Sequence, residues 1–292
     1  DHRDLHLSLR RQRQMCIRDS VEIHAARSIA KAFDKLKLPY DRTEKSKEPS
    51  FTKNFLQNHP HDLPKAIAEA RELNKAHSTF IDSITVKQKI LDEGSYEVLI
   101  EAGKLIAESI TGGGKLLICG NGGSAADAQH LAAEFLIRLT SEVNRGSIPA
   151  LSLAQDTSTL TACLNDYGPD DIFKRVFSGL SSEGDVLLAI TTSGNSRNVI
   201  ETLKLAKARN IFSLGFLGNE GGEALKYCDL AFVVPDNVTA RIQESHITAG
   251  HALLQYVEDK LLESGWLTIC LLYTSDAADE GLGVDLGGRR II

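Results

Sequence analysis

Five short apolar segments, separated by helix-like segments, constrain the fold of this 292-residue chain more than any other feature. Each segment is continuously apolar rather than alternating, which is typical of parallel strands that are buried on both faces. The segments are KLLIC (115–119), PALSL (149–153), DVLLAI (185–190), IFSLGF (211–216) and DLAFVV (229–234). Helix-like segments follow most of them, and the last runs from about 239 to 262. This alternation predicts an α/β fold with a doubly wound, five-stranded parallel sheet, preceded by helices at 80–93 and 95–110.

Composition and charge exclude several classes of protein. A net charge of −6 gives no electrostatic reason to expect a nucleic-acid partner. No apolar run approaches the roughly 20 residues that span a bilayer, so we expect no membrane association. The start of the chain lacks the apolar stretch of a secretory signal, and the five cysteines are scattered without a CxxC pair. These features predict a cytoplasmic protein with reduced thiols.

The two ends of the chain do not resemble natural protein. The segments RRQRQMCIRDS (10–20) and CLLYTSDAADE (270–280) are related as translations of opposite strands of one nucleotide sequence, as a sequencing adapter would give. We therefore interpret residues 1–20 and 268–292 as artefacts that form no ordered structure. Residues 21–79 contain helix-like stretches of unknown origin and no recognisable chemistry. The functional domain is predicted to span residues 80–267.

A glycine-rich turn, GNGGS (120–124), follows the first predicted strand and opens a helix. Glycines allow the backbone to approach an anion, and a helix N-terminus offers free N–H groups and a positive dipole end. A tight turn with Ser124 as the helix N-cap is an equally good interpretation of this segment alone. The pattern is not GxGxxG, which disfavours a dinucleotide.

A hydroxyl-rich turn, TTSGNS (191–196), follows the third predicted strand and also leads into a helix. Ligands of doubly wound folds bind at the carboxyl ends of the strands, where both turns should lie. Hydroxyls and backbone N–H groups suit a phosphate that is held without much positive charge. The two turns together predict a phosphorylated ligand.

Three motifs in this order and spacing, CGNGGSAADAQH (119–130), ITTSGNS (190–196) and TARIQESH (239–246), resemble the phosphoheptose isomerases. These enzymes belong to the sugar isomerase (SIS) superfamily. The resemblance extends over roughly 185 residues and includes LNDYG (164–168) and GNEGG (218–222). It implies a flavodoxin-like three-layer sandwich and a zinc-dependent aldose–ketose isomerase.

The resemblance also implies the roles of individual residues. One zinc ion per site would be held by His130, Glu134, Gln243 and His251, and Glu134 and His251 would form the acid/base pair that moves a proton through an enediol. Substrate contacts would come from Asn121, Gly122, Gly123, Ser124, Asn165, Asp166, Thr191, Thr192, Ser193, Ser196 and Gln243. Asp127 could support His130, or could simply be an acidic residue of the first helical turn. His246 is expected to serve packing or an interface, because it lies about 140° around the helix from His251.

Two departures from the family pattern are visible. Thr191 stands where serine is more usual, which keeps the hydroxyl, and FLIRL (135–139) is more apolar than the usual segment after the glutamate. The second departure concerns contacts just beyond Glu134 rather than the metal site.

The reaction that the resemblance implies converts sedoheptulose 7-phosphate to D-glycero-D-manno-heptose 7-phosphate, a step in heptose biosynthesis for lipopolysaccharide core or another heptose-containing glycan. The resemblance implies a homotetramer with sites between subunits. One alternative is a non-catalytic SIS regulator of the replication-initiator-associating type, but that group lacks the counterparts of Glu134 and His251. The other is an isomerase of a different phosphosugar, which would usually carry further regulatory domains for which little chain remains after residue 266.

Overall fold

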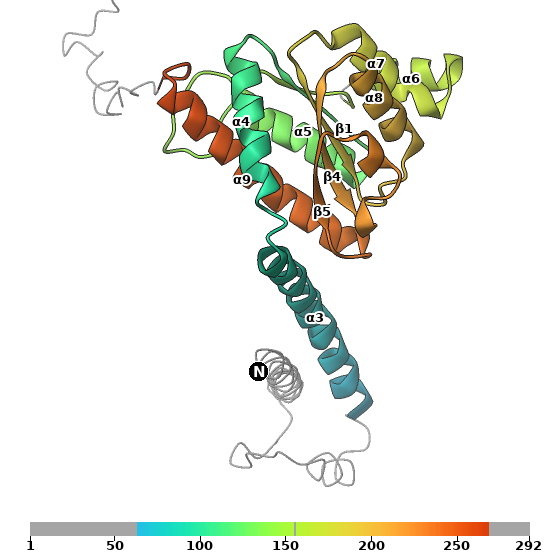
Figure 1. The fold of residues 1–292 in the computed structure, drawn as a ribbon. Coiled ribbons are helices and arrows are strands. Elements are labelled where there is room, and N and C mark those ends of the chain that lie inside the picture. The colour runs from blue at the N-terminus through green and yellow to red at the C-terminus, as the bar shows by residue number, and fades with distance from the viewer. Residues whose placement is uncertain (1–62, 155, 269–292) are drawn as a thin grey trace, which may run out of the picture. The chain divides into compact units, whose positions relative to one another are not determined.

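A computed structural model of the chain describes residues 63–154 and 156–268 (Figure 1). The chain divides between Ile84 and Thr85 into two compact units, and each is considered by itself. The described part of the first unit is helical and belongs to α3 (Leu63–Glu93). Separate helices were expected on either side of residue 79, whereas α3 runs through that position without a break. The interpretations of residues 1–20, 21–62 and 269–292 lie outside the described residues and stay predictions.

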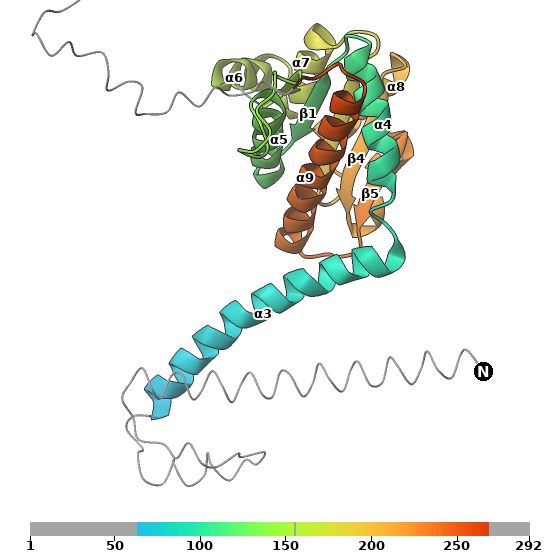
Figure 2. The same cartoon turned by 90° about the vertical axis from the view of Figure 1, so that its left-hand side faces the viewer.

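The second unit is built on a five-stranded parallel sheet with the order β2-β1-β3-β4-β5 (Figures 1 and 2). All five predicted strands are present, and each lies within two residues of its predicted bounds. The strands are β1 (Leu116–Gly120), β2 (Ala150–Ser152), β3 (Val186–Thr191), β4 (Phe212–Gly218) and β5 (Leu230–Val234). The helices are α4 (Val98–Thr111), α5 (Gly123–Leu136), α6 (Thr157–Asp166), α7 (Ile172–Leu180), α8 (Arg197–Ala208) and α9 (Thr239–Glu263), with short 3₁₀ turns at Pro169–Asp171, Asn219–Gly221 and Ala224–Tyr227.

The sheet is covered by helices on both faces, which gives three layers and confirms the predicted fold class. Successive residues of each strand point to opposite faces, so Leu116 and Ile118 of β1 join the core beneath α4, α5 and α9. Leu117 and Cys119 of the same strand join a second core beneath α7 and α8. Both cores need apolar residues, and this is why the strands are continuously apolar in sequence.

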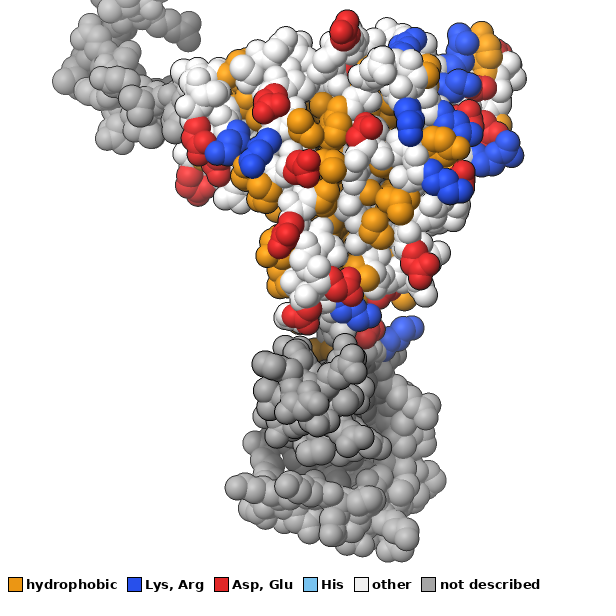
Figure 3. All heavy atoms as spheres, in the orientation of Figure 1, with side chains coloured by type: hydrophobic (Ala, Val, Ile, Leu, Met, Phe, Trp, Pro, Cys, Tyr) orange, Lys and Arg blue, Asp and Glu red, His pale blue; other side chains and the backbone are white. Residues whose placement is uncertain are grey.

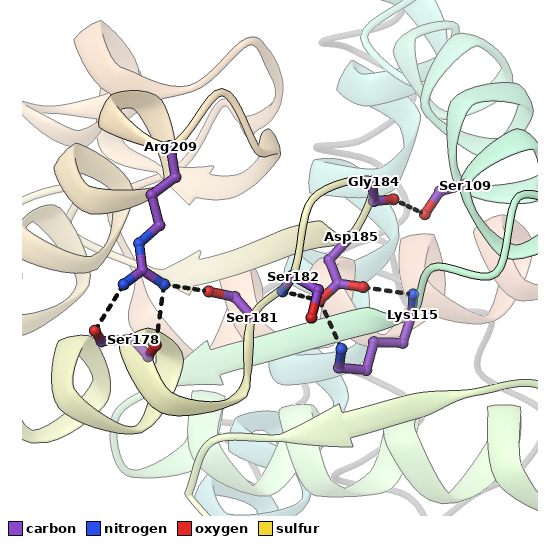
Figure 4. Close-up of polar contacts among 8 residues, drawn as sticks. All are labelled: Ser109, Lys115, Ser178, Ser181, Ser182, Gly184, Asp185 and Arg209. Carbon is purple, nitrogen blue, oxygen red and sulfur yellow. Dashed lines mark hydrogen bonds and ion pairs between the residues drawn. The ribbon is translucent and has the colours of Figure 1, made fainter.

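The amino ends of the strands are joined by a polar network that leaves few groups unsatisfied (Figure 4). Asp185, which precedes β3, is buried, and its carboxylate accepts hydrogen bonds from the backbone N–H and the Nζ of Lys115 at 3.0 and 2.7 Å. The Ser182 N–H donates to the same carboxylate at 2.7 Å. Nearby, Arg209 donates to the carbonyl and the hydroxyl of Ser178 in the last turn of α7. At this edge, the polar groups named above are therefore paired with one another by hydrogen bonds.

The surface of the described part carries charges of both signs. On the face shown in Figure 3, acidic and basic side chains are interspersed with exposed apolar ones. No helix among the described residues is long and apolar enough to cross a membrane.

Candidate functional site

The sheet order places the two predicted ligand turns side by side. β1 pairs directly with β3, while the chain continues from β1 outward to β2 and from β3 outward to β4 and β5. The chain therefore reverses its winding between β1 and β3, and ligands of open α/β sheets bind at such a position, outside the carboxyl ends of the strands. The turns after β1 and β3 both lie there, as expected.

The turn after β1 brings the start of α5 against α9. Gly122 is the N-cap of α5 with φ 56°, so the alternative in which Ser124 is the N-cap is wrong. Glycine adopts this left-handed conformation without the penalty that a Cβ brings. A Cβ on Gly123 would lie 2.3 Å from the amide nitrogen of Gln243. The Gln243 side chain thus occupies the space beside Gly123, and Ser124 is buried at the second position of the helix.

A pair of asparagine amides joins the turn after β1 to the start of α8. The Asn121 Nδ2 donates to the Asn198 Oδ1 at 2.8 Å, and the Asn198 Nδ2 donates back to the Asn121 Oδ1 at 2.9 Å. Asn198 was not identified from the sequence, because a lone asparagine in a helix carries no signal of a partner 77 residues away. The pair fixes the orientation of an amide that we expect to contact substrate.

Three hydroxyls converge at the carboxyl end of β3. The Thr191 Oγ1 lies 3.0 Å from the Ser196 Oγ and 3.5 Å from the Ser193 Oγ. Ser196 is the N-cap of α8, and its hydroxyl makes no side-chain capping bond but lies at the helix N-terminus beside the Thr191 hydroxyl. A helix N-terminus with several hydroxyls suits a phosphate group. The resemblance assigns these three residues to the phosphate, together with Thr192 and Ser124.

The turn after β4 packs against the hydroxyl-rich turn. Four consecutive residues have left-handed φ angles, including Asn219 (49°) and Glu220 (60°), which have side chains. A Cβ on Gly194 would lie 2.1 Å from the Gly221 carbonyl oxygen. The Asn195 Oδ1 accepts a hydrogen bond from the Glu223 N–H at 3.0 Å. The backbone of this turn therefore leaves room for glycine alone at position 194.

Two histidines and a glutamate meet between α5 and α9. The His130 Nε2 lies 2.9 Å from the His251 Nε2 and 3.8 Å from the Glu134 Oε1. His130 and Glu134 share one face of α5 because they are four residues apart. The structure thus brings together three of the four predicted zinc ligands, while Gln243 lies against Gly123 at the start of the same helix pair.

The charge environment of this cluster includes the half-buried carboxylate of Asp127. Asp127 lies one turn before His130, beyond the first turn of α5, so the simple helix-dipole explanation of Asp127 is wrong. Burial raises the pKa of Asp127, and the neighbouring His130 opposes that shift. The Asp127 Oδ2 is buried and has no hydrogen-bond partner among the described residues.

The donor set can be tested against zinc by distance. Zinc binds imidazole nitrogens at about 2.0–2.1 Å, so two nitrogens on one ion lie within about 4 Å of each other. The His130 and His251 Nε2 atoms satisfy this limit at 2.9 Å. Within residues 63–154 and 156–268, however, no group of three or more His, Cys, Asp or Glu side chains is arranged to hold a metal ion. Zinc binding therefore stays a prediction. The His130 and His251 imidazoles lie close enough together to bind one ion.

Comparison with known proteins decides the family. The sequence model of the SIS domain matches residues 69–217. The phosphoheptose isomerase of Chlorobaculum tepidum is 46% identical over 177 residues, which are 60% of this chain and 84% of that relative. The phosphoheptose isomerase of Clostridium acetobutylicum is 45% identical over 187 residues, covering 61% of this chain and 91% of the relative. The chain belongs to the phosphoheptose isomerase family.

Comparison with a solved structure supports the same family. The phosphoheptose isomerase of Neisseria gonorrhoeae is 39% identical, with a TM-score of 0.59, and the match covers 63% of this chain and 97% of that one. The expected enzyme class, an aldose–ketose isomerase with an SIS domain, is thereby confirmed.

Two residues that the phosphoheptose isomerase pattern assigns to substrate are not joined to the rest of the site. Asn165 and Asp166 are exposed at the end of α6, and the Asn165 Nδ2 donates to the Asp166 Oδ1 at 2.8 Å. In the described part of the chain, no hydrogen bond connects either residue to the turns after β1 and β3. Their contact with substrate stays a prediction.

Proposed function

We propose that the chain interconverts sedoheptulose 7-phosphate and D-glycero-D-manno-heptose 7-phosphate. The observation that carries this proposal is the meeting of His130, Glu134 and His251 between α5 and α9, together with the hydroxyl-rich turn that follows β3. An isomerase of a phosphorylated sugar needs both a proton-transfer centre and a phosphate site. The relatives named phosphoheptose isomerase support the choice of a seven-carbon sugar.

The hydroxyl-rich turn would hold the phosphate. The Thr191, Ser193 and Ser196 hydroxyls donate to phosphate oxygens, and the N-terminus of α8 supplies the positive end of its dipole. Ser124, with the glycines before it, offers the N-terminus of α5 from the other side. Asn121, held by Asn198, is oriented to donate to a sugar hydroxyl.

Glu134 and His251 would carry the proton between C1 and C2. Isomerisation removes a proton from the carbon beside the carbonyl, forms an enediol and returns the proton to the neighbouring carbon. A carboxylate is suited to accept the carbon-bound proton, and an imidazole can exchange a proton with the oxygens, because its ordinary pKa lies near neutrality. The two side chains come from different helices and meet around His130.

The same cluster would hold zinc through His130, Glu134, Gln243 and His251. When bound there, zinc supplies Lewis-acid polarisation of the substrate carbonyl. A ring nitrogen bound to metal cannot transfer a proton at the same time. The acid/base role and the ligand role of His251 therefore require separate measurements.

The test measures turnover of sedoheptulose 7-phosphate by the full chain and by two conservative variants. Glu134→Gln keeps the size of the side chain and an oxygen donor, and His251→Gln keeps a polar side chain of similar length. Both remove basicity. Loss of a general acid or base lowers kcat by about 10²- to 10⁴-fold. Zinc content of each purified variant, measured by elemental analysis, separates loss of proton transfer from loss of metal.

Glu201→Gln is the matched control for a lost carboxylate. Glu201 is paired with Lys204 at 2.8 Å on the surface of α8, so its loss has little effect on stability or turnover. Full activity of Glu134→Gln or His251→Gln would contradict the acid/base assignment. A wild-type chain that binds the sugar phosphate without turning it over would favour the regulatory alternative.

We also propose that the enzyme is a cytoplasmic homotetramer. The resemblance to phosphoheptose isomerases supports this proposal, and sedimentation equilibrium of the purified chain tests the oligomeric state.

A further inference from the structure

A buried arginine lies directly behind the candidate proton-transfer centre. The Arg145 side chain, in the segment between α5 and β2, has no exposed surface, and it forms an ion pair with Glu258 of α9, whose side chain is 5% exposed. The Arg145 Nη2 donates to the Glu134 carbonyl oxygen at 2.9 Å, and the Nη1 donates to the Phe135 carbonyl oxygen at 3.0 Å. A third bond reaches the Gly146 carbonyl oxygen at 2.9 Å.

These contacts close the C-terminal end of α5. The last four carbonyl groups of a helix have no partner within the helix and must be satisfied from outside. Arg145 satisfies two of them, and its positive charge lies at the negative end of the helix dipole. One of the two carbonyls belongs to Glu134 itself, so the backbone that carries the proposed base is held by this guanidinium.

Arg145 also sets α5 against α9, because Glu258 belongs to the helix that carries His251. His251 and Glu258 are seven residues apart, which places them on the same side of α9 about 10 Å apart. Contacts between the two helices occur at three levels along their length: Gly123 with Gln243, Leu131 with Gly250, and the end of α5 with Glu258 through Arg145. The His130–His251 contact lies at the middle level.

We propose that Arg145 and Glu258 are positioning residues, which hold Glu134 and His130 of α5 in register with His251 of α9. A fork of guanidinium N–H groups can bond two carbonyls and a carboxylate at once, whereas an ammonium is a single point charge. The pair therefore fixes the distance between the two helices as well as neutralising its own charges. The kinetic part of this proposal rests on the proposed isomerase function.

The test compares Arg145→Lys and Glu258→Asp with Asp185→Asn in the full chain. The first two variants keep the charges. Arg145→Lys replaces the fork of N–H groups by a single ammonium, and Glu258→Asp shortens the side chain that reaches Arg145 from α9. Asp185→Asn weakens the pair between the buried Asp185 carboxylate and Lys115 at the amino ends of β1 and β3, so it loses stability without removing a contact of α5 or α9. Urea unfolding reports the stability of all three. Kinetics and the imidazole NMR shifts of His130 and His251 report the geometry of the site.

We expect Arg145→Lys and Glu258→Asp to lower kcat by about 10- to 100-fold with little change in KM, because small displacements of reacting groups have effects of this size. The imidazole shifts of His130 and His251 change in both variants. Asp185→Asn is destabilised but keeps its kcat and both sets of shifts. A purely structural role would make all three variants alike.

Two results would overturn the proposal. The first is a variant of Arg145 or Glu258 that loses stability as Asp185→Asn does but retains wild-type kcat and imidazole shifts. The second is a change in the imidazole NMR shifts of His130 and His251 that also occurs in Asp185→Asn. If wild-type chain turns over no sugar phosphate, the proposed function fails, and the imidazole shifts still decide the positioning role by the same comparison. If Arg145→Lys does not fold, Glu258→Asp carries the test.

Discussion

The two edges of the sheet differ in whether their buried polar groups have hydrogen-bond partners. At the amino edge, the Asp185 carboxylate accepts three hydrogen bonds from Lys115 and Ser182, and the groups around it are similarly paired (Figure 4). On the helices that border the carboxyl edge, buried oxygens of Asp127 and Glu244 and a buried nitrogen of His246 have no hydrogen-bond partner among the described residues. The hydroxyls of Thr191, Ser193 and Ser196 at that edge lie beside one another.

The difference shows which edge is built for stability and which for binding. A buried polar atom without a partner costs about 1–3 kcal/mol, so a fold selected for stability alone would pair it. Such atoms gather where a ligand, a metal ion or a partner can supply the missing bonds. The amino edge gains nothing from such groups and has none of this kind in the described residues.

One glycine at each end of β3 gives the largest expected difference between the amino and carboxyl edges. Gly184 at the amino edge and Gly194 at the carboxyl edge both have left-handed φ angles, of 85° and 65°. A Cβ on Gly184 meets nothing within 4 Å, whereas a Cβ on Gly194 would lie 2.1 Å from the Gly221 carbonyl oxygen. Gly184→Ala therefore adds backbone strain of about 1–2 kcal/mol. Gly194→Ala adds overpacking of about 1–3 kcal/mol to the same strain.

Urea unfolding and steady-state kinetics check both glycine variants. We expect Gly194→Ala to be the less stable of the two and to raise KM, because the hydroxyls of Ser193 and Ser196 move with the turn. Gly184→Ala should keep wild-type KM. Equal losses of stability with equal KM values would remove the distinction between the two edges.

The pH dependence of stability provides a second comparison. His246 is buried against Phe216 and Phe232, as the packing interpretation from the sequence expected, and burial lowers its pKa to about 4. In the unfolded chain the pKa is near the ordinary value of about 6.5. The unfolded state therefore binds more protons between these values, and the contribution of neutral His246 is lost as pH falls from about 6.5 to about 4. The total is on the order of 3 kcal/mol at most.

The measurement is urea unfolding at pH 7 and pH 5 for wild type and His246→Gln. The variant keeps an N–H donor for the Leu217 carbonyl oxygen but does not titrate. Wild type should lose more stability than the variant over this interval, since the other titrating groups are common to both. Parallel losses would mean that His246 is not held neutral by burial.

The sequence predicted local features of both edges but not the pairs that join distant segments. Continuous apolar runs located all five strands, and the turns after β1 and β3 were located by their glycines and hydroxyls. Asn198 and Arg145 went unrecognised, because each is an ordinary residue whose partner is brought near by the fold. Their partners Asn121 and Glu258 lie 77 and 113 residues away along the chain. The continuity of α3 was also missed, since polar residues near position 79 do not by themselves end a helix.

The smallest effect is expected from the amide pair between Asn121 and Asn198. Both amides are partly accessible to water, so loss of their two hydrogen bonds by Asn198→Ala costs about 1 kcal/mol. Because the pair orients Asn121 rather than taking part in proton transfer, the loss should appear as a roughly fivefold rise in KM with kcat unchanged. Gln88→Ala, which removes an exposed amide bonded to Asp92 at 2.9 Å, is the control and should leave both constants unchanged. A fall in kcat with constant KM would instead place Asn121 in the chemical step, and the carboxyl edge would then bind and react through the same amide.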